Sequence, residues 1–358
     1  MKPPVLLILF NRPDLTEELF SIIEKNCGHR KIYIAIDGPR QNNDSDSKLC
    51  AEVVRLANNF ASQHKDHCRL LIQPKNLGCG NGVKAAIDWF FENEEAGIIL
   101  EDDCHPNADF FWVLDDLLER YRSNESIFMV SGTCFLPNGL YHSADYFLSK
   151  YAQIWGWGTW RRVWKNYQFV LDDKYQIELQ HMIKQTCLDY PERLYWLNQL
   201  SRLRASNPPF TWDYQLQFMA WKNGQKSLIP SKNLVINKGF TKNATNTITN
   251  ENKKNLFLKS SYDQILSNKI HCDLSYNADN DKIIFWFCIL CGDINRFRQI
   301  INESDCYFDL ETDYSCEKKR KQEEVDILQA KIDWMENSLS WKLTRPLRQL
   351  LSSFTNRR

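Results

Sequence analysis

The sequence predicts an α/β fold in which helices cover both faces of a mostly parallel sheet. Strand and helix patterns alternate over the first 135 residues, and this order is typical of parallel strands joined by crossover helices. The first predicted strand is a continuous apolar run, as in strands buried on both faces. The 358 residues divide into a domain over 1–255, with halves 1–135 and 136–255, a helical region over 256–315 packed on it, and a helical extension over 316–358.

Each predicted element follows from a local pattern. Apolar runs predict strands over residues 5–10, 31–36, 68–72, 97–100 and 127–131. Apolar residues at helical spacing predict helices over 15–25, 46–64, 82–92 and 108–122. Asp14, with Glu17 three residues later, predicts the N-cap of the first helix, and the glycine-rich stretch 76–82 leads into the third. Beyond about residue 140 the pattern is less regular and rich in aromatic residues, and it becomes helical again over about 255–310.

Composition indicates an ordinary globular protein and excludes some partners. Charged residues make up 25% of the chain, but the formal net charge is zero, so nothing points to a nucleic-acid partner. The twelve cysteines lack paired metal-ligand spacing, and the one CxxC, at 288–291, falls in an apolar run typical of buried thiols. Such cysteines, with no secretion signal before the first strand, favour a reducing cytoplasm. No apolar run reaches the roughly 18 residues of a membrane span.

Polar clusters follow three of the predicted strands: Asn11-Arg12, Asp37 and Glu101-Asp102-Asp103. Because ligands bind beyond the carboxyl ends of the strands in such sheets, we expect these clusters to meet at one edge. Three consecutive carboxylates repel one another, and a divalent cation relieves that repulsion. Mg²⁺ or Mn²⁺ prefers carboxylate oxygens and bridges them to phosphate oxygens. The alternative is a solvated acidic loop at the end of a strand.

These segments resemble the nucleotide-sugar glycosyltransferases of the GT-A fold, and among them the N-acetylglucosaminyltransferase I-like branch and bacterial surface-polysaccharide transferases. The resemblance covers roughly residues 4–250 and rests on LFNRP at 9–13, NLG at 76–78, and EDD at 101–103 with its following proline and DFF. It implies a hexosyl- or N-acetylhexosaminyltransferase with a GT-A (Rossmann-like) sheet. The half over 1–135 would then bind the nucleotide-sugar, and the half over 136–255 would bind the acceptor.

The same resemblance implies roles for four of the strand-end residues. Asp103 would coordinate Mn²⁺ or Mg²⁺, and Asp102 would lie against the ribose or the sugar of the donor. Arg12 and Asp37 would lie in the nucleotide pocket, where Asp37 would accept a hydrogen bond from uracil or its equivalent. A carboxylate is chemically suited to these contacts, because it accepts from base N–H groups and ribose hydroxyls.

A second candidate site is the Trp-Asp segment at 212–213. A carboxylate in aromatic, apolar surroundings has a raised tendency to act as a base. The related branch carries a Trp-Asp segment that supplies the catalytic base, which implies this role for Asp213. The chain departs from that pattern at Tyr214, where the family has a second Asp. Asp213 is also a favourable N-cap for a helix over 214–222, and the two roles are compatible.

Tryptophans are predicted to form the acceptor side. Trp155 and Trp157 are separated by a glycine that allows a tight turn, and flat indole faces stack on sugars. Trp212, beside the candidate base, is expected to join them. The alternative is a tryptophan-rich corner of the core.

Three lysines are candidates for neutralising the phosphates of the donor. Lys84 lies near the start of a predicted helix, where anions bind, although the spacing of a Walker loop is missing. Lys238 and Lys242 belong to a polar segment over 237–247, and in the related enzymes a loop at this position orders over the donor diphosphate. The alternative for this segment is a surface connection.

The end of the chain suggests a surface or partner contact. Residues 340–358 contain five basic and no acidic residues beside an apolar face. Such a helix lies on an anionic membrane surface, or it docks against the protein's own body or a partner helix. A heptad-like apolar stripe over 325–339 is a candidate for pairing two subunits in a homodimer.

The residues and the resemblance together predict a metal-dependent, inverting glycosyltransferase of surface-polysaccharide biosynthesis. It would move a sugar from a nucleoside-diphosphate sugar, first of all a UDP-sugar, to a hydroxyl of a glycan or lipid-linked acceptor, in the cytoplasm or peripherally at the inner face of the membrane. One alternative is a sugar-phosphate nucleotidylyltransferase, which requires a glycine-rich loop with Arg and Lys after the first strand. The other is a non-catalytic carbohydrate-binding protein, which has no need for Asp103 and Asp213 together.

Overall fold

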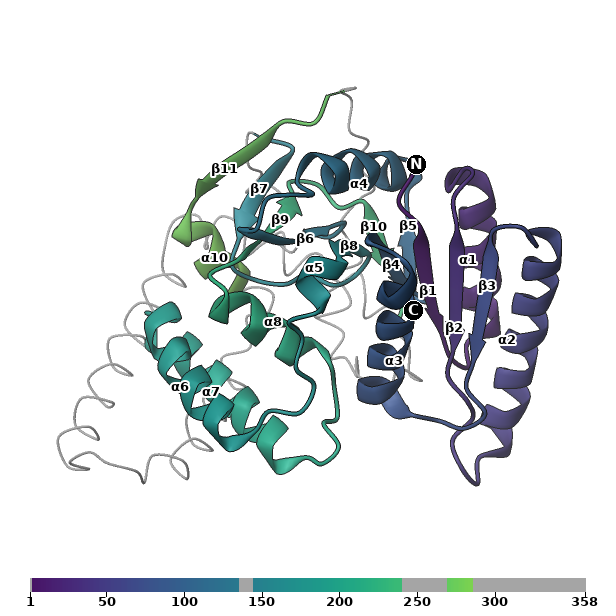
Figure 1. Cartoon of the computed structure of the whole chain (residues 1–358), viewed down its shortest axis with the longest axis horizontal. Coiled ribbons are helices and arrows are strands. Elements are labelled where there is room, and N and C mark those ends of the chain that lie inside the picture. The colour runs from purple at the N-terminus through teal and green to yellow at the C-terminus, as the bar shows by residue number, and fades with distance from the viewer. Residues whose placement is uncertain (1, 135–143, 240–268, 286–358) are drawn as a thin grey trace, which may run out of the picture.

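A nine-stranded mixed sheet forms the centre of the molecule in a computed structural model that describes residues 2–134, 144–239 and 269–285 (Figure 1). Its strands are Val5–Leu9 (β1), Ile32–Ile36 (β2), Cys68–Ile72 (β3), Ala96–Glu101 (β4), Ile127–Ser131 (β6), Tyr146–Ser149 (β7), Trp157–Trp160 (β8), Lys226–Pro230 (β9) and Cys272–Tyr276 (β11). Their order is β11-β7-β9-β6-β8-β4-β1-β2-β3. Five of the strand pairings in this sheet are parallel and three are antiparallel, which confirms the predicted mostly parallel α/β class.

The first half of the sheet, β3-β2-β1-β4, is entirely parallel. Its connecting helices are Pro13–Asn26 (α1), Asp44–Gln63 (α2) and Gly78–Asn93 (α3), and Ala108–Arg120 (α4) follows β4. The predicted N-cap Asp14 is wrong, because α1 begins at Pro13, two residues before the predicted start, and Arg12 occupies the cap position. Proline suits the first turn, since its missing N–H would have no partner there. Helix α3 also begins before the predicted residue 82, so the glycine-rich stretch forms its first turn.

Helices α3 and α4 pack on opposite faces of the sheet, where two glycines allow a close approach. A Cβ at Gly97 in β4 would collide with the Phe90 ring of α3, and a Cβ at Gly158 in β8 would lie 2.9 Å from Leu118 of α4. Gly158 pairs with Ile98, the strand neighbour of Gly97, so the two glycines face opposite sides. This agrees with the predicted helices on both faces.

The second half of the sheet is mixed, because β8 runs antiparallel between β4 and β6. Helices Arg161–Trp164 (α5), Asp173–Thr186 (α6), Tyr190–Ala205 (α7), Asp213–Lys222 (α8) and Ala278–Ile284 (α10) belong to this half. Helices α6, α7 and α8 pack beside it over a second apolar core that includes Leu179, Trp196 and Phe218 (Figure 1). A small antiparallel sheet pairs Cys104–Pro106 (β5) with Val235–Asn237 (β10), which brings residue 237 beside the acidic triplet.

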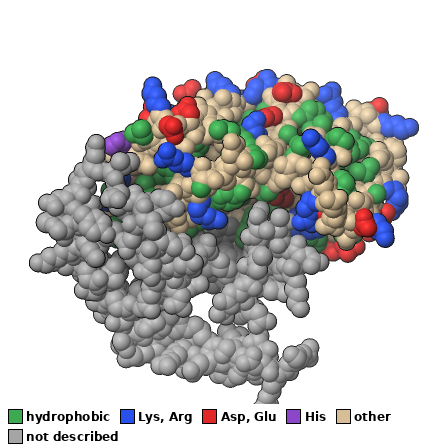
Figure 2. All heavy atoms as spheres, turned by 90° about the horizontal axis from the view of Figure 1, so that it is seen from below, with side chains coloured by type: hydrophobic (Ala, Val, Ile, Leu, Met, Phe, Trp, Pro, Cys, Tyr) green, Lys and Arg blue, Asp and Glu red, His purple; other side chains and the backbone are tan. Residues whose placement is uncertain are grey.

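Beyond residue 255, where a helical region was predicted, the structure describes residues 269–285, and these form one strand and one helix. Strand β11 pairs in parallel with β7, and α10 follows it. Residues 256–268 and 286–358 lie outside the described residues, and with them the CxxC segment, the heptad-like stripe and the basic C-terminal helix. In the described part of the chain, no helix is long and apolar enough to cross a bilayer. Figure 2 shows positively and negatively charged side chains scattered over one face of the described part of the molecule.

Candidate functional site

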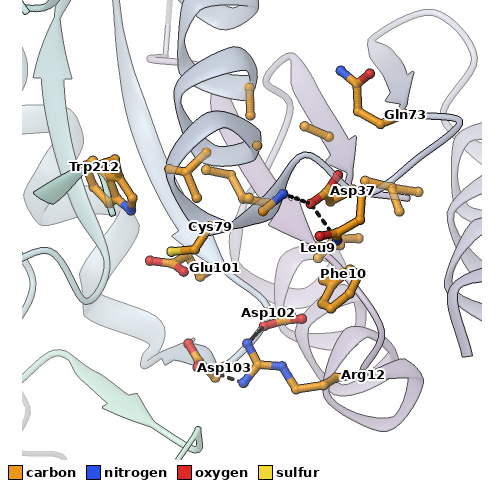
Figure 3. Close-up of a pocket in the computed structure, with 18 of the residues that line it drawn as sticks. Leu9, Phe10, Arg12, Asp37, Gln73, Cys79, Glu101, Asp102, Asp103 and Trp212 are labelled. Atoms are coloured by element: carbon orange, nitrogen blue, oxygen red, sulfur yellow. Dashed lines mark hydrogen bonds and ion pairs between the residues drawn. The ribbon is translucent and has the colours of Figure 1, made fainter. Parts of the chain in front are cut away.

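A cavity of about 360 Å³ opens at the carboxyl ends of β1, β2 and β4 (Figure 3). Its volume lies within the range of small-molecule sites, and its position is the one expected for ligands of α/β sheets. Eight of the residues singled out in the sequence line it: Arg12, Asp37, Glu101, Asp102, Asp103, Trp155, Trp212 and Asp213. The cavity therefore joins residues from both halves of the domain.

Arg12 holds two carboxylates of the acidic triplet. Strands β1 and β4 are parallel neighbours in register, with Ile8 opposite Glu101, so the residues that follow them reach the same edge. The Arg12 Nη1 lies 2.9 Å from Asp103 Oδ2, and its Nη2 contacts Asp102 Oδ1. Burial alone would lower the pKa of Arg12, but the charges of Asp102 and Asp103 outweigh that effect and hold the pKa above its usual value.

The cavity carries more negative than positive groups. Five carboxylates and two guanidiniums line it among the described residues. Burial, followed by the charge of Asp103, raises the pKa of Glu101, and burial raises the pKa of Asp102 despite the contact with Arg12. A cation bound nearby would stabilise the charged forms of these acids. The site therefore suits a cationic partner or a metal-bound anion.

Asp103 offers a metal ion a single carboxylate, so the remaining ligands would have to come from a bound substrate. Within the described residues, no three His, Cys, Asp or Glu side chains are grouped so that they could hold a metal ion by themselves. Mg²⁺ and Mn²⁺ commonly use one or two carboxylates together with phosphate oxygens. The Lys238 N–H donates to the backbone oxygen of Asp103 at 2.8 Å, and a Cβ at Gly239 would collide with Asp103 Oδ2. The chain after β10 thus lies directly against the carboxylate.

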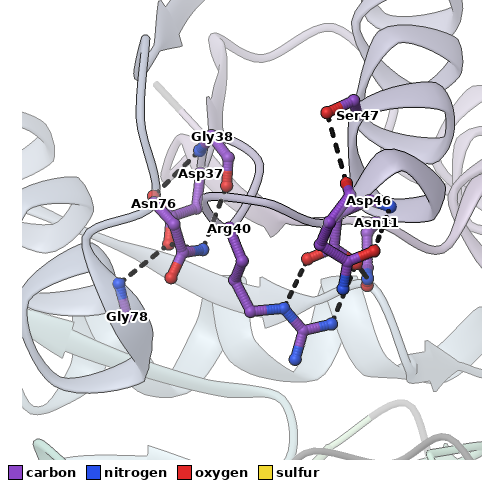
Figure 4. Close-up of polar contacts among 9 residues, drawn as sticks. Asn11, Asp37, Gly38, Arg40, Asp46, Ser47, Asn76 and Gly78 are labelled. Atoms are coloured by element: carbon purple, nitrogen blue, oxygen red, sulfur yellow. Dashed lines mark hydrogen bonds and ion pairs between the residues drawn. The ribbon is translucent and has the colours of Figure 1, made fainter.

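Asp37 is occupied by the protein itself (Figure 4). Its Oδ1 accepts from the backbone N–H groups of Gly38 at 2.9 Å and Leu77 at 2.8 Å. Its Oδ2 accepts from the side-chain amide of Asn76 at 2.9 Å and the N–H of Gly78 at 3.2 Å. A carboxylate has about four acceptor positions, so this geometry leaves none for uracil, contrary to the expected base contact.

Asp37 instead caps the first turn of α3. Burial raises its pKa, and the hydrogen bonds from Leu77, Gly38 and Gly78 oppose that effect. Lys84, the predicted phosphate contact on this helix, does not line the cavity and pairs with Asp88 one turn further on. The prediction placed a ligand phosphate at this helix terminus, but a protein carboxylate already lies there.

A second polar group on the Asp37 side of the cavity was missed in the sequence. Arg40 lines the cavity, its guanidinium carbon lies 5.5 Å from the Phe10 ring centroid, and its Nη2 donates to Asp46 Oδ1 at 2.9 Å (Figure 4). The Asn11 amide donates to the same Asp46 oxygen at 2.8 Å. Arg40 follows Asp37 by three residues in one strand-end segment, and that proximity was an available signal. Its guanidinium is paired with Asp46 beside the cavity.

Asp213 enters the cavity from the start of α8. It is the first residue of the helix and Trp212 occupies the cap position, so the predicted N-cap assignment is displaced by one residue. Its Oδ1 accepts from the Thr211 hydroxyl at 2.5 Å and from the Tyr214 N–H at 3.0 Å. Burial raises the pKa of Asp213, and the Thr211 hydroxyl opposes that effect. The half-buried carboxyl is thereby oriented, and its affinity for a proton is increased.

The tryptophans divide between the cavity and the core. Trp155 and Trp212 line the cavity. Trp157, expected beside them, is 1% exposed and stacks on Trp212, with centroids 5.9 Å apart and planes at 18°. Gly156 between the two adopts a φ of +68°, and this turn in the chain lets Trp155 line the cavity while Trp157 lies in the core. Trp157 therefore supports Trp212 from the core instead of facing an acceptor.

The predicted lysines of the 237–247 segment are only partly described. Lys238 forms an ion pair with Glu18 of α1 and does not line the cavity. Lys242 lies outside the described residues. Asn237, the first residue of this segment, lines the cavity, and its Oδ1 accepts from the Gly239 N–H at 2.7 Å.

Comparisons with known proteins identify no family for this chain. No protein-family model matches it, and no curated protein does. Among solved structures, a cytidylyltransferase from Leptospira borgpetersenii serovar Hardjo-bovis (strain JB197) has 10% identity and a TM-score of 0.30, over 54% of this chain and 71% of that one.

Two further structures are similar at the same low level. A 4-diphosphocytidyl-2C-methyl-D-erythritol synthase has 12% identity and a TM-score of 0.23, over 39% of this chain and 64% of that one. A mannose-1-phosphate geranyltransferase from Thermus thermophilus has 12% identity and a TM-score of 0.35, over 64% and 74% of the two chains. With TM-scores this low, the similarities carry no argument about the activity of this protein.

Proposed function

We propose that this protein is a nucleotide-sugar-dependent glycosyltransferase that inverts the anomeric centre. The observation that supports the proposal most is the meeting of two groups from distant parts of the chain in one cavity. Arg12, Asp102 and Asp103 come from the ends of β1 and β4, and Asp213 comes from the start of α8. A diphosphate-binding side and a separate base are what sugar transfer to a hydroxyl requires.

The proposed donor side is the acidic edge of the sheet. Asp103, with phosphate oxygens of the donor, would hold Mn²⁺ or Mg²⁺, which supplies charge stabilisation for the leaving diphosphate when bound. Arg12 keeps Asp102 and Asp103 in a fixed orientation through its two contacts. Arg40, held by Asp46, would offer its remaining N–H groups to the nucleoside. The nucleobase must be recognised by groups other than Asp37, because the protein occupies the acceptor positions of that carboxylate.

The proposed acceptor side is formed by Trp155, Trp212 and Asp213. The indole faces offer stacking surfaces for a sugar ring, and the Asp213 carboxylate takes the proton of the attacking hydroxyl. Its raised pKa strengthens it as a base while the Thr211 hydroxyl fixes its orientation. General base catalysis of this kind contributes typically about 10²–10⁴-fold.

The sugar-phosphate nucleotidylyltransferase alternative is less well supported by the same geometry. Only residues 10–12 separate β1 from α1, and they contain no glycine. A glycine-rich loop that wraps a nucleoside triphosphate has no room there. The base-like placement of Asp213 beside two cavity tryptophans also has no evident use in that reaction.

One experiment tests both reactions. The protein is incubated with UDP-, GDP-, dTDP- and CMP-sugars and a panel of glycan acceptors, with and without Mn²⁺, and nucleotide release is measured. We expect metal-dependent release of a nucleoside diphosphate, with Asp213→Asn lowering turnover by about 10²–10⁴-fold while calorimetry shows unchanged donor binding. Asp116→Asn, which changes a partly exposed carboxylate on α4 outside the cavity, is the matched control and keeps full turnover.

Two outcomes would overturn the proposal. Near-normal turnover of Asp213→Asn would show that Asp213 is not the catalytic base. Formation of a nucleotide-sugar and pyrophosphate from a nucleoside triphosphate and a sugar 1-phosphate would establish the alternative reaction instead.

A further inference from the structure

The helix that carries Asp213 is tied to a neighbouring segment of the cavity wall by the side chain of Gln217. This residue lies in α8 and is 3% exposed. Its Nε2 donates to the carbonyl oxygen of Lys150 at 2.7 Å, and its Oε1 accepts from the N–H of Ala152 at 2.7 Å. Gln217 thus uses both ends of its amide on the backbone of one short segment.

That segment leads directly into the cavity wall. Residues 150–156 connect β7 to β8 and include Ile154 and Trp155, which line the cavity. The far end of the segment is held by the end of β6, where the Ser131 hydroxyl donates to the oxygen of Gln153 at 2.7 Å. The near end is held by Gln217. The segment is therefore anchored to the sheet through Ser131 at one end and to α8 at the other, where Ser227 of β9 and Asp281 of α10 also hold its backbone.

The spacing along α8 gives this anchor a specific consequence. Asp213, Gln217 and Trp221 are four residues apart in turn, so they lie along one face of the helix. The Trp221 indole N–H also donates to the Lys150 oxygen, at 2.8 Å. Rotating α8 about its axis would turn Asp213 away from the cavity and break the bonds of Gln217 and Trp221 together.

We propose that Gln217 is a positioning residue that sets the rotation of α8 and keeps the Asp213 carboxylate facing the cavity wall at Trp155. The inference rests on the proposed function, because it assigns Gln217 an effect on the base of that reaction. A purely structural Gln217 would contribute to folding in the same way as any buried, hydrogen-bonded glutamine. The two roles differ in what happens to turnover in the folded enzyme.

The chain offers a matched control in Gln225, just beyond the other end of α8. Gln225 is 8% exposed and its Nε2 donates to the oxygen of Glu125 at 2.8 Å, but it does not line the cavity. We compare Gln217→Met with Gln225→Met, since methionine keeps the length of the side chain and removes its hydrogen bonds. For Gln217→Met we expect kcat per folded protein to fall by about 10²-fold, as for a misplacement of about 1 Å. The KM for the donor should be unchanged, and Gln225→Met should keep wild-type kcat.

A second variant protects the test against simple misfolding. Gln217→Glu retains an acceptor for the Ala152 N–H, and in the neutral form that burial favours it donates to the Lys150 oxygen through its O–H, so its kcat should lie between wild type and Gln217→Met. A third measurement needs no turnover. Hydrogen exchange at amides 211–215 and 152–155 should accelerate in Gln217→Met and not in Gln225→Met.

The outcomes separate the inference from the proposed function. If the unaltered protein transfers no sugar, the proposed function fails, while faster exchange at both segments still supports the positioning of α8. Equal kcat and equal exchange in the two methionine variants would overturn the inference, even in an active transferase.

Discussion

Replacing Thr211 by valine should move the pH dependence of turnover without removing the proposed base. The Thr211 hydroxyl donates to Asp213 Oδ1 at 2.5 Å, and its side chain is 8% exposed. Valine keeps the shape of threonine and removes the donor. The hydroxyl stabilises the charged form of Asp213, so its loss should raise the pKa of that carboxyl further above the usual value.

The size of the shift follows from the strength of the bond. A hydrogen bond to a charged group contributes about 1.5–3 kcal/mol, and one pKa unit corresponds to about 1.4 kcal/mol. Loss of this hydrogen bond therefore corresponds to a rise of about 1–2 units in the pKa of the carboxyl. Asp213 is only half-buried and water replaces part of what is lost, so we expect a rise of about 1 unit.

The measurement is the pH profile of kcat. A base acts in its deprotonated form, so turnover falls as the pH drops through the pKa of Asp213, and a higher pKa moves this acidic limb to higher pH. Thr211→Val should move the limb up by about 1 unit and leave the alkaline plateau near wild type. Thr159→Val is the control, because Thr159 donates to the Phe128 oxygen at 2.5 Å and does not line the cavity. An acidic limb that stays in place in folded Thr211→Val would refute the role of this bond.

Two further variants test the donor side. Asp37→Asn leaves at least two of four donors without an acceptor, so thermal denaturation should show about 1–3 kcal/mol less stability. An unchanged Tm together with lost affinity for uridine nucleotides would instead support the base contact. Gly239→Ala places a Cβ against Asp103 Oδ2, so calorimetry should show Mn²⁺-dependent donor binding weakened by about 10-fold or more, as for lost support of a metal ligand. Unaltered binding would argue against Asp103 as the metal ligand.

The first half of the fold was predictable because its signals are local. Strand β3 lies where the apolar run predicted it, and β1 and β2 differ from their predicted ranges by a single residue. Helix starts were less accurate, since Pro13 begins a helix that a capping pattern placed later, and Gly78 begins one that was placed after the glycine-rich stretch. The second half escaped prediction because β8 and β11 join the sheet through partners that lie far away in the sequence.

The candidate site was predictable as a set of residues and not as a set of contacts. Residues at the ends of parallel neighbouring strands must meet, which is why Arg12 and the acidic triplet were found. Whether a side chain faces the cavity depends on packing. Trp157 was assigned to the acceptor side, yet it lies in the core against Trp212. The anchoring role proposed for Gln217 has no sequence signature, because its partners are backbone atoms 65 and 67 residues away.

The sequence by itself determined the class of the fold and the edge of the sheet at which chemistry can occur. Both depend on periodicity and on the residues that directly follow each strand. Only the tertiary structure decided that Asp37 is bound by residues 39 to 41 positions further on, and that Asp213 shares a cavity with Arg12. Hydrogen-bond partners and shared cavities depend on how distant segments pack, and no local pattern in the chain records that packing.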